Sequence, residues 1–218
     1  MTKLIDALIV ELQDGVTWID KLFVNIGIPS EEEVIQVAAG CFDIAIELQS
    51  GILLLCRARS FALVFAAQRL IFEAVIRGLF IQYCIDERKF HSFKNGGTLG
   101  KYESMIVEIE KKLGDEVLDF EKFRARLEGS MHHFTHTGYQ HVARRYATGI
   151  LGPNYSERDI CTAINLTALF GFQAAARMAI IANRPELALA TKEKMVAYSS
   201  RYMVLKKQFP QNPDRENK

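Results

Sequence analysis

The sequence predicts an all-α protein, an antiparallel bundle of about six or seven helices. Three observations predict this fold class. Runs of alternating β-branched residues, and Asn-Gly turns between such runs, are missing from the sequence. Apolar residues recur three and four positions apart along most of the chain, as on the buried face of a helix. Gly, Pro and Asn separate the helical stretches, and two stretches begin with a Ser-x-x-acid capping sequence.

Three helices are expected in the first part of the chain. They cover about 4–23, about 31–55, and a third stretch that opens at Ser60. Gly15 is a point where the first helix could bend, and the segment 25–29, which ends in proline, terminates it. The short stretch between the second and third helices is either a break or a continuation of the helix.

Local sequence also marks where individual helices begin. Ser30 and Glu33 form a capping box that opens the second helix, and Ser156 and Asp159 form another one later in the chain. Pro185 fits the first turn of the last helix, where a missing N–H costs nothing. The remaining elements are predicted as a polar loop at 86–101 with its tip at 95–97, helices at 102–113, 115–131, 156–183 and 185–207, and a loop at 147–155.

The composition is that of a globular protein. The 218 residues are 49% hydrophobic and 24% charged, which suits one domain with a full core, expected over residues 1–208. The polar segment 209–218 is expected to be a disordered tail. The net charge of +1 gives no overall attraction to nucleic acid or to an anionic membrane, so any basic site must be local.

The cysteine pattern and the N-terminus favour a cytoplasmic protein. The four cysteines are far apart and form no Cys-x-x-Cys pair, which argues against a zinc knuckle or a disulfide framework and for reduced thiols. The N-terminal apolar stretch contains acidic residues and does not resemble a signal peptide.

One helical segment, Ser60–Cys84, is apolar on nearly every side and is therefore expected to be buried. Its three charged residues, Arg69, Glu73 and Arg77, follow one another at intervals of four and form a single stripe, which we call the ladder. The segment is long enough to cross a membrane, but three central charges oppose this, so no membrane partner is expected. A buried ladder needs partners.

The ladder has two interpretations. Arginine presents a fork of donors that fits a phosphate, so the ladder could be a buried anion site. It could equally be a structural polar network that fixes the register of neighbouring helices.

A second polar segment, 132–145, offers groups that could meet the ladder. If it is helical, His132, His136, Gln140 and Arg144 share one stripe. An arginine there could hold phosphate, and a histidine could act as general base or acid near neutral pH. The structural alternative is that these side chains only satisfy the buried ladder.

Other site types are less well supported by the sequence. His132 and His136 have the spacing of helical zinc ligands, with Glu128 one turn earlier, but there is no His-Glu-x-x-His pattern, and no metal or other cofactor is expected. Residues 95–102 resemble a phosphate-binding loop only in part, because Asn95 replaces the first glycine and Tyr102 follows the lysine. No nucleophile signature occurs.

Two segments together resemble an uncharacterised family of bacterial helical proteins. The first, Ala67–Leu79, contains Arg-x3-Glu-x3-Arg, and the second, Phe134–Arg145, contains Thr-His-Thr-Gly-x-Gln-x3-Arg-Arg. The layout is also similar to HEPN-like helical bundles, and Arg126 with His132 fits the Arg-x5-His spacing of their motif.

The HEPN-like resemblance implies a metal-independent ribonuclease, or an RNA or nucleotide-phosphate binder, in a toxin–antitoxin or phage-defence system. It implies a homodimer and an antitoxin or other operon partner. We therefore expect His136 or His132 to activate a ribose hydroxyl, Arg126 or Arg144 to stabilise charge on phosphorus, and Glu73 to orient these groups. Arg69, Arg77, Gln140 and Arg144 are expected to bind phosphate. The alternative is a non-catalytic helical scaffold whose polar cluster is structural.

Overall fold

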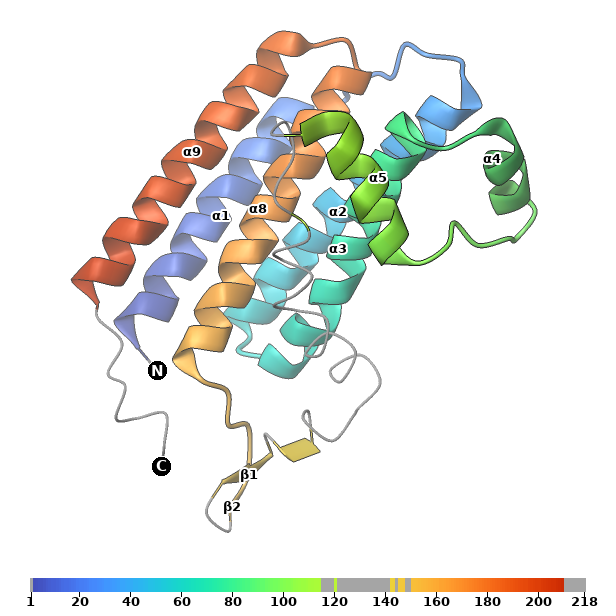
Figure 1. Cartoon of the computed structure of the whole chain (residues 1–218). Coiled ribbons are helices and arrows are strands. Elements are labelled where there is room, and N and C mark those ends of the chain that lie inside the picture. Colours follow the sequence, from blue (N-terminus) through green and yellow to red (C-terminus); the bar gives the residue numbers. More distant parts are fainter. Residues whose placement is uncertain (1, 115–119, 121–141, 144, 148–149, 210–218) are drawn as a thin grey trace.

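A computed structural model describes residues 2–114, 120, 142–143, 145–147 and 150–209, and this part of the chain is an all-α bundle (Figure 1). The predicted fold class is confirmed. The described helices are α1 (Lys3–Phe23), α2 (Glu33–Arg57), α3 (Phe61–Tyr83), α4 (Glu87–Lys94), α5 (Tyr102–Leu113), α8 (Glu157–Ile181) and α9 (Pro185–Gln208). A minimal antiparallel pair of strands, β1 (Tyr146–Ala147) and β2 (Ile150–Leu151), accompanies them.

Helix α8 is the central element of the bundle. It packs against α1, α2, α3 and α9, and most of its residues are buried. Helices α1, α8 and α9 run side by side, while α5 lies against α3 at the edge of the bundle (Figure 1). A helix surrounded in this way must be apolar on all sides, which explains why α8 lacks a clear polar face.

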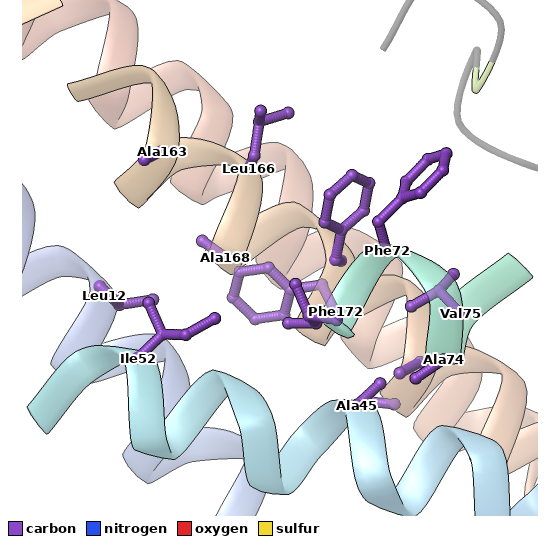
Figure 2. Close-up of a cluster of buried hydrophobic side chains, with 14 of the residues drawn as sticks. Leu12, Ala45, Ile52, Phe72, Ala74, Val75, Ala163, Leu166, Ala168 and Phe172 are labelled. Carbon is purple, nitrogen blue, oxygen red and sulfur yellow. The ribbon is translucent and has the colours of Figure 1, made fainter. Parts of the chain in front are cut away.

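The centre of the core is built from side chains of four long helices, to which α5 and α9 add further buried residues. In Figure 2, Leu12 of α1, Ile52 of α2, Phe72 of α3 and Phe172 of α8 belong to one cluster, and each is almost fully buried. Burying a large apolar side chain contributes about 1.5–3 kcal/mol, so this cluster, rather than any ion pair, dominates the favourable side of the folding free energy.

Close approach of α2 and α3 depends on a glycine. A Cβ atom added to Gly78 of α3 would lie 2.6 Å from the ring of Phe42, which is fully buried in α2. Since real Cβ atoms do not come so close, only glycine allows the phenylalanine ring to lie against the α3 backbone.

Several helix ends follow local sequence. The Ser156 side chain accepts a hydrogen bond from the Asp159 backbone N–H, as its capping box predicts, and Pro185 occupies the first turn of α9. Helices α1 and α8 end in left-handed residues, Asn25 and Asn183, a conformation that asparagine tolerates well.

Two predicted boundaries differ from the structure. Ser30 does not cap α2: the helix begins at Glu33, and the Ser30 hydroxyl instead accepts from the Glu32 N–H in the preceding turn. Residues 86–101, predicted as a loop, contain α4, whose first turn Asp86 caps by accepting from the Lys89 N–H. The loop prediction failed because the helix is short and its aromatic residues, rather than a periodic apolar stripe, attach it to the core.

Other expectations have different outcomes. The helix at 102–113 is confirmed as α5. The predicted loop at 147–155 includes β2 and part of β1, two-residue strands that confirm how scarce strand signals are in the sequence. The predicted helix at 115–131 and the predicted tail beyond residue 209 lie outside the described residues, and a single domain over 1–208 stays a prediction.

Two described helices, α2 and α8, are long and apolar enough to cross a membrane by length and composition alone. In α8, 83% of the apolar window is buried within the fold, as in the core helix of a bundle, against 39% in α2. One or two such helices are weak grounds for a membrane span. Helix α3 is not among them, since every window of that length within it contains all three ladder charges.

Candidate ligand site at the Arg-Glu-Arg ladder

The ladder lies on the outer side of α3. The opposite side of this helix is buried against α2 and α8, and a third flank contacts α5. The ladder side chains are 27% (Arg69), 19% (Glu73) and 43% (Arg77) exposed. The ladder, which was predicted to be buried, is therefore only partly buried. Most apolar residues of α3 fill its buried sides, and the polar stripe lies on a side that is partly open to solvent.

Glu73 is the centre of the ladder. Its Oε1 accepts from Arg69 Nε at 2.9 Å, and its Oε2 lies 3.8 Å from a terminal nitrogen of Arg77. The first contact is a charge-assisted hydrogen bond, and the second is a loose ion pair in a more exposed position. Glu73 thus holds Arg69 firmly and leaves Arg77 freer to meet another anion.

Arg69 connects the ladder to α5. Its guanidinium carbon lies 6.0 Å from the centre of the Tyr102 ring, and the same ring meets Phe72 edge-on at 6.3 Å. The aromatic contact belongs to the core and the cation–π contact to its rim. Tyr102 therefore fixes the side of the ladder that faces α5.

Arg77 has the least satisfied side chain of the ladder. Its Nε is buried and finds no hydrogen-bond partner among the described residues, although the guanidinium as a whole is partly exposed. Arg77 also lies near Cys41 of α2. Burial raises the pKa of the Cys41 thiol, and the positive charge of Arg77 opposes that rise.

The ladder has a positive balance and an opening to solvent. Two guanidinium groups share one carboxylate, so the cluster carries one positive charge in excess. An incoming oxyanion could accept from Arg77 without displacing the bond between Arg69 and Glu73. This geometry allows an anion to bind.

Most of the predicted partners of the ladder lie outside the described residues. These are Arg126, His132, His136, Gln140 and Arg144, together with Glu128, which entered the metal alternative. The structure therefore does not place them relative to Glu73. Among the described residues, no group of three or more His, Cys, Asp or Glu side chains could hold a metal ion.

Three residues at the end of the second segment are described, Val142, Ala143 and Arg145. The guanidinium of Arg145 lies 6.0 Å from the centre of the Tyr155 ring, and that ring packs on Phe65 of α3 at 5.1 Å. Phe65 precedes Arg69 by one helical turn. Arg145 and Tyr155, which follow the histidine-rich segment, therefore lie near the first turns of α3, where Phe65 is four residues before Arg69 of the ladder.

Sequence reasoning missed three buried polar side chains on α8, those of Thr167, Gln173 and Arg177. Thr167 bonds to Gln68 of α3, and Arg177, only 4% exposed, donates to the Tyr83 hydroxyl at 3.1 Å. A signal was present for Arg177, because it is the only charged residue in the stretch from Ala168 to Ala182. A charged residue in an otherwise apolar helix needs a partner when it is buried, as was argued for the charges of α3, and this holds for Arg177 too.

A shallow hollow lies away from the ladder, between α4 and the start of α2. Its lining mixes acidic and basic side chains, among them Glu33, Asp86, Lys89 and His91. The partial phosphate-loop pattern at 95–102 forms the turn between α4 and α5, and no strand precedes it. Neither feature has the geometry of a nucleotide site.

Comparisons with known proteins give a family but no activity. A family profile described as a family of unknown function matches residues 42–204. The matched range begins inside α2 and ends inside α9, so it contains both the ladder and α8. No curated protein and no solved structure matches the chain.

Proposed function

The chain belongs to DUF6988, a family of unknown function, and we propose that it is a HEPN-like protein that binds the phosphate of RNA or a nucleotide at the ladder and cleaves RNA without a metal ion. The observation that carries the proposal is Arg77: it is partly exposed, only loosely paired to Glu73, and its Nε has no partner among the described residues. An arginine in this state is suited to donate hydrogen bonds to a phosphate oxygen.

The proposed chemistry uses side chains of this chain and water. His136 or His132 takes the proton of a ribose 2′-hydroxyl, whose oxygen attacks the adjacent phosphorus, and the 5′-oxygen leaves with a proton from a second imidazole or from water. Arg126 or Arg144 stabilises the negative charge that develops on phosphorus, and Gln140 binds the phosphate with the arginines. Glu73 orients Arg69 and Arg77.

Binding is tested first, with labelled single-stranded RNA and fluorescence anisotropy. Arg77→Ala should weaken binding by about 10–100-fold, since a hydrogen bond to a charged group contributes about 1.5–3 kcal/mol. The slope of log affinity against log salt should flatten by about 0.7, the value for one lost contact to a single strand. Arg88→Ala, which removes an exposed arginine from α4, is the matched control. Equal affinities of both variants and the unmodified protein would contradict phosphate binding at the ladder.

Cleavage is tested separately, with total RNA in the presence of a chelator. The unmodified protein should degrade RNA, and His136→Ala should reduce the rate strongly while RNA affinity is kept. If both proteins degrade RNA at the same rate in chelator, the catalytic part of the proposal is wrong. RNA binding is then judged by the anisotropy result alone.

A second function, a non-catalytic helical scaffold, is favoured by a different observation. The 2.9 Å bond between Arg69 and Glu73 and the contact of Arg69 with Tyr102 tie α3 to α5, as a purely architectural ladder would. In a scaffold, Glu73→Ala should lower stability by about 1–3 kcal/mol, between the values for exposed and buried pairs, and no variant should affect RNA. In the anion site, Arg77→Ala should leave the melting temperature unchanged or raise it.

We further propose a cytoplasmic homodimer with an antitoxin or other operon partner, in keeping with the HEPN-like resemblance. Four free cysteines in the described part of the chain suit a reducing compartment. Four apolar side chains on the outer surface of α2 and α3, which we call the α2–α3 surface, are at least half exposed: Ile44, Leu54, Leu63 and Leu70. A second copy of this chain is the occupant that we propose for that surface.

Charge complementarity supports a second copy as the occupant. The exposed charges in the middle of α2, Asp43 and Glu47, are acidic, whereas Arg57 at the end of the helix is basic and exposed. A two-fold axis near Gly51 that places the two α2 helices antiparallel sets Arg57 of each copy opposite Asp43 and Glu47 of the other.

A further inference from the structure

A layer of polar side chains crosses the core of the bundle. Gln49 of α2, Gln68 of α3 and Thr167 of α8 are each at most 2% exposed. Helices α2 and α3 are joined by a short turn and run antiparallel, with Gln49 eight residues before the end of α2 and Gln68 seven residues after the start of α3. The two glutamines are therefore level with each other, and both reach α8 at adjacent residues, Thr167 and Ala168.

Each glutamine uses its amide nitrogen on α8. Gln68 Nε2 donates to Thr167 Oγ1 at 2.6 Å, and the threonine hydroxyl donates in turn to the Ala163 carbonyl at 2.9 Å. Gln49 Nε2 donates to the Ala168 carbonyl at 3.4 Å, at the long end of the range for a hydrogen bond.

Both amide oxygens are left without a donor. Gln49 Oε1 and Gln68 Oε1 are buried, and neither finds a hydrogen-bond partner among the described residues. Exchanging nitrogen and oxygen does not help, because Gln49 would then turn its oxygen toward the Ala168 carbonyl, and Gln68 would leave an NH2 group without an acceptor. Each unpaired buried oxygen costs about 1–3 kcal/mol, a large penalty to accept twice in one layer.

The backbone of α8 accommodates this arrangement. A Cβ atom added to Gly171 would lie 2.0 Å from the Gln49 amide carbon, so the amide occupies the space that any other residue at 171 would fill. Gly171 lets a polar group lie directly against a central helix. The glycine therefore provides a specific space in the core for the polar amide of Gln49.

We propose that this layer is a binding site for internal water, which donates its hydrogens to Gln49 Oε1 and Gln68 Oε1. Water is the smallest ligand with two donors, and buried water is held in proteins by otherwise unsatisfied polar groups of this kind. The site is independent of the ladder and of the proposed ribonuclease function.

The double variant Q49M/Q68M tests the proposal. Methionine has a similar length and no hydrogen-bonding group, and the groups that the glutamines leave behind keep their helix partners, since Thr167 already donates to Ala163. We expect a melting temperature equal to that of the unmodified protein or higher. Oxygen-17 relaxation dispersion of the solvent should show loss of the long-lived water signal that belongs to the layer.

The control is Gln36→Met, which replaces an exposed glutamine of α2 and should leave the dispersion amplitude unchanged. An amplitude that is the same in Q49M/Q68M and in the unmodified protein overturns the proposal. If the double variant does not fold, a crystal structure of the unmodified protein decides: water density within hydrogen-bond distance of both amide oxygens supports the site, and dry packed oxygens overturn it.

Discussion

At the scale of single residues, exposure decides what the ladder can do. Arg69 and Arg77 are the same residue type on the same helix, and both face Glu73. Arg69 is held in place by a 2.9 Å hydrogen bond to Glu73 and by contact with the Tyr102 ring, whereas Arg77 is more exposed and forms only a loose ion pair with Glu73. We therefore propose a structural role for Arg69 and a ligand-binding role for Arg77.

Residue burial also predicts a response to alkaline pH. Burial in the core raises the pKa of the Cys56 thiol from 9.0 to about 12, against the opposing charge of Arg59. Because the folded state holds this proton more tightly than the unfolded state, the stabilisation is complete below about pH 9 and is lost as pH rises toward 12. Burial also raises the pKa of Tyr198, which adds to the loss in the same direction.

We expect the melting temperature to fall between about pH 9 and about pH 11, and to fall less in Cys56→Ser, because serine does not titrate in this range. Thermal melts followed by circular dichroism at several pH values measure the slope of melting temperature against pH for both proteins. Melts at pH 7, where neither side chain is ionised, give the baseline for each protein. Identical slopes in the two proteins would show that Cys56 is not the group responsible.

At the scale of elements, two glycines inside helices allow the effect of helix propensity on stability to be measured apart from the effect of core packing. A Cβ atom at Gly78 would strike the Phe42 ring, whereas one at Gly40 of α2 would meet nothing within 4 Å. Gly78→Ala should lower the free energy of unfolding by about 1–3 kcal/mol, the usual cost of overpacking a core. Gly40→Ala should raise it by up to about 1 kcal/mol, because alanine is the better helix former.

Urea denaturation of both variants measures the two effects under the same conditions. The pair is matched, since each change adds one methyl group inside a long helix. If Gly78→Ala were as stable as Gly40→Ala, the close contact between α2 and α3 would not exist as described.

At the scale of the whole molecule, the α2–α3 surface predicts the oligomeric state. We expect a dimer by size-exclusion chromatography with light scattering, and a monomer for Leu63→Glu, because a carboxylate within an apolar interface would be buried without a partner. Val107→Glu is the control: this valine of α5 is similarly exposed at 60% but lies outside the surface. A monomer at every concentration of the unmodified protein, or equal behaviour of both variants, would exclude the surface as a dimer interface.

Much of the fold follows from local sequence. The helix that begins after Ser156, the helix after Pro185 and the helix at 102–113 are set by caps, proline and apolar spacing, which act within a few residues. Helix α4 and the late start of α2 were not predicted from the sequence, because short helices and turns depend on contacts with the rest of the molecule. The outcome for the ladder was mixed: its spacing on one helix was predicted correctly, its burial was not.

The sequence by itself determined the helical class of this protein and the alignment of Arg69, Glu73 and Arg77 on one face, because a helix brings every fourth residue to the same side. Only the tertiary structure decided which side of α3 turns outward, and it also joined Gln49, Gln68 and Thr167 into one buried layer. Those residues are separated by up to 118 positions, from 49 to 167, and side chains so far apart in the chain meet only when three helices pack together.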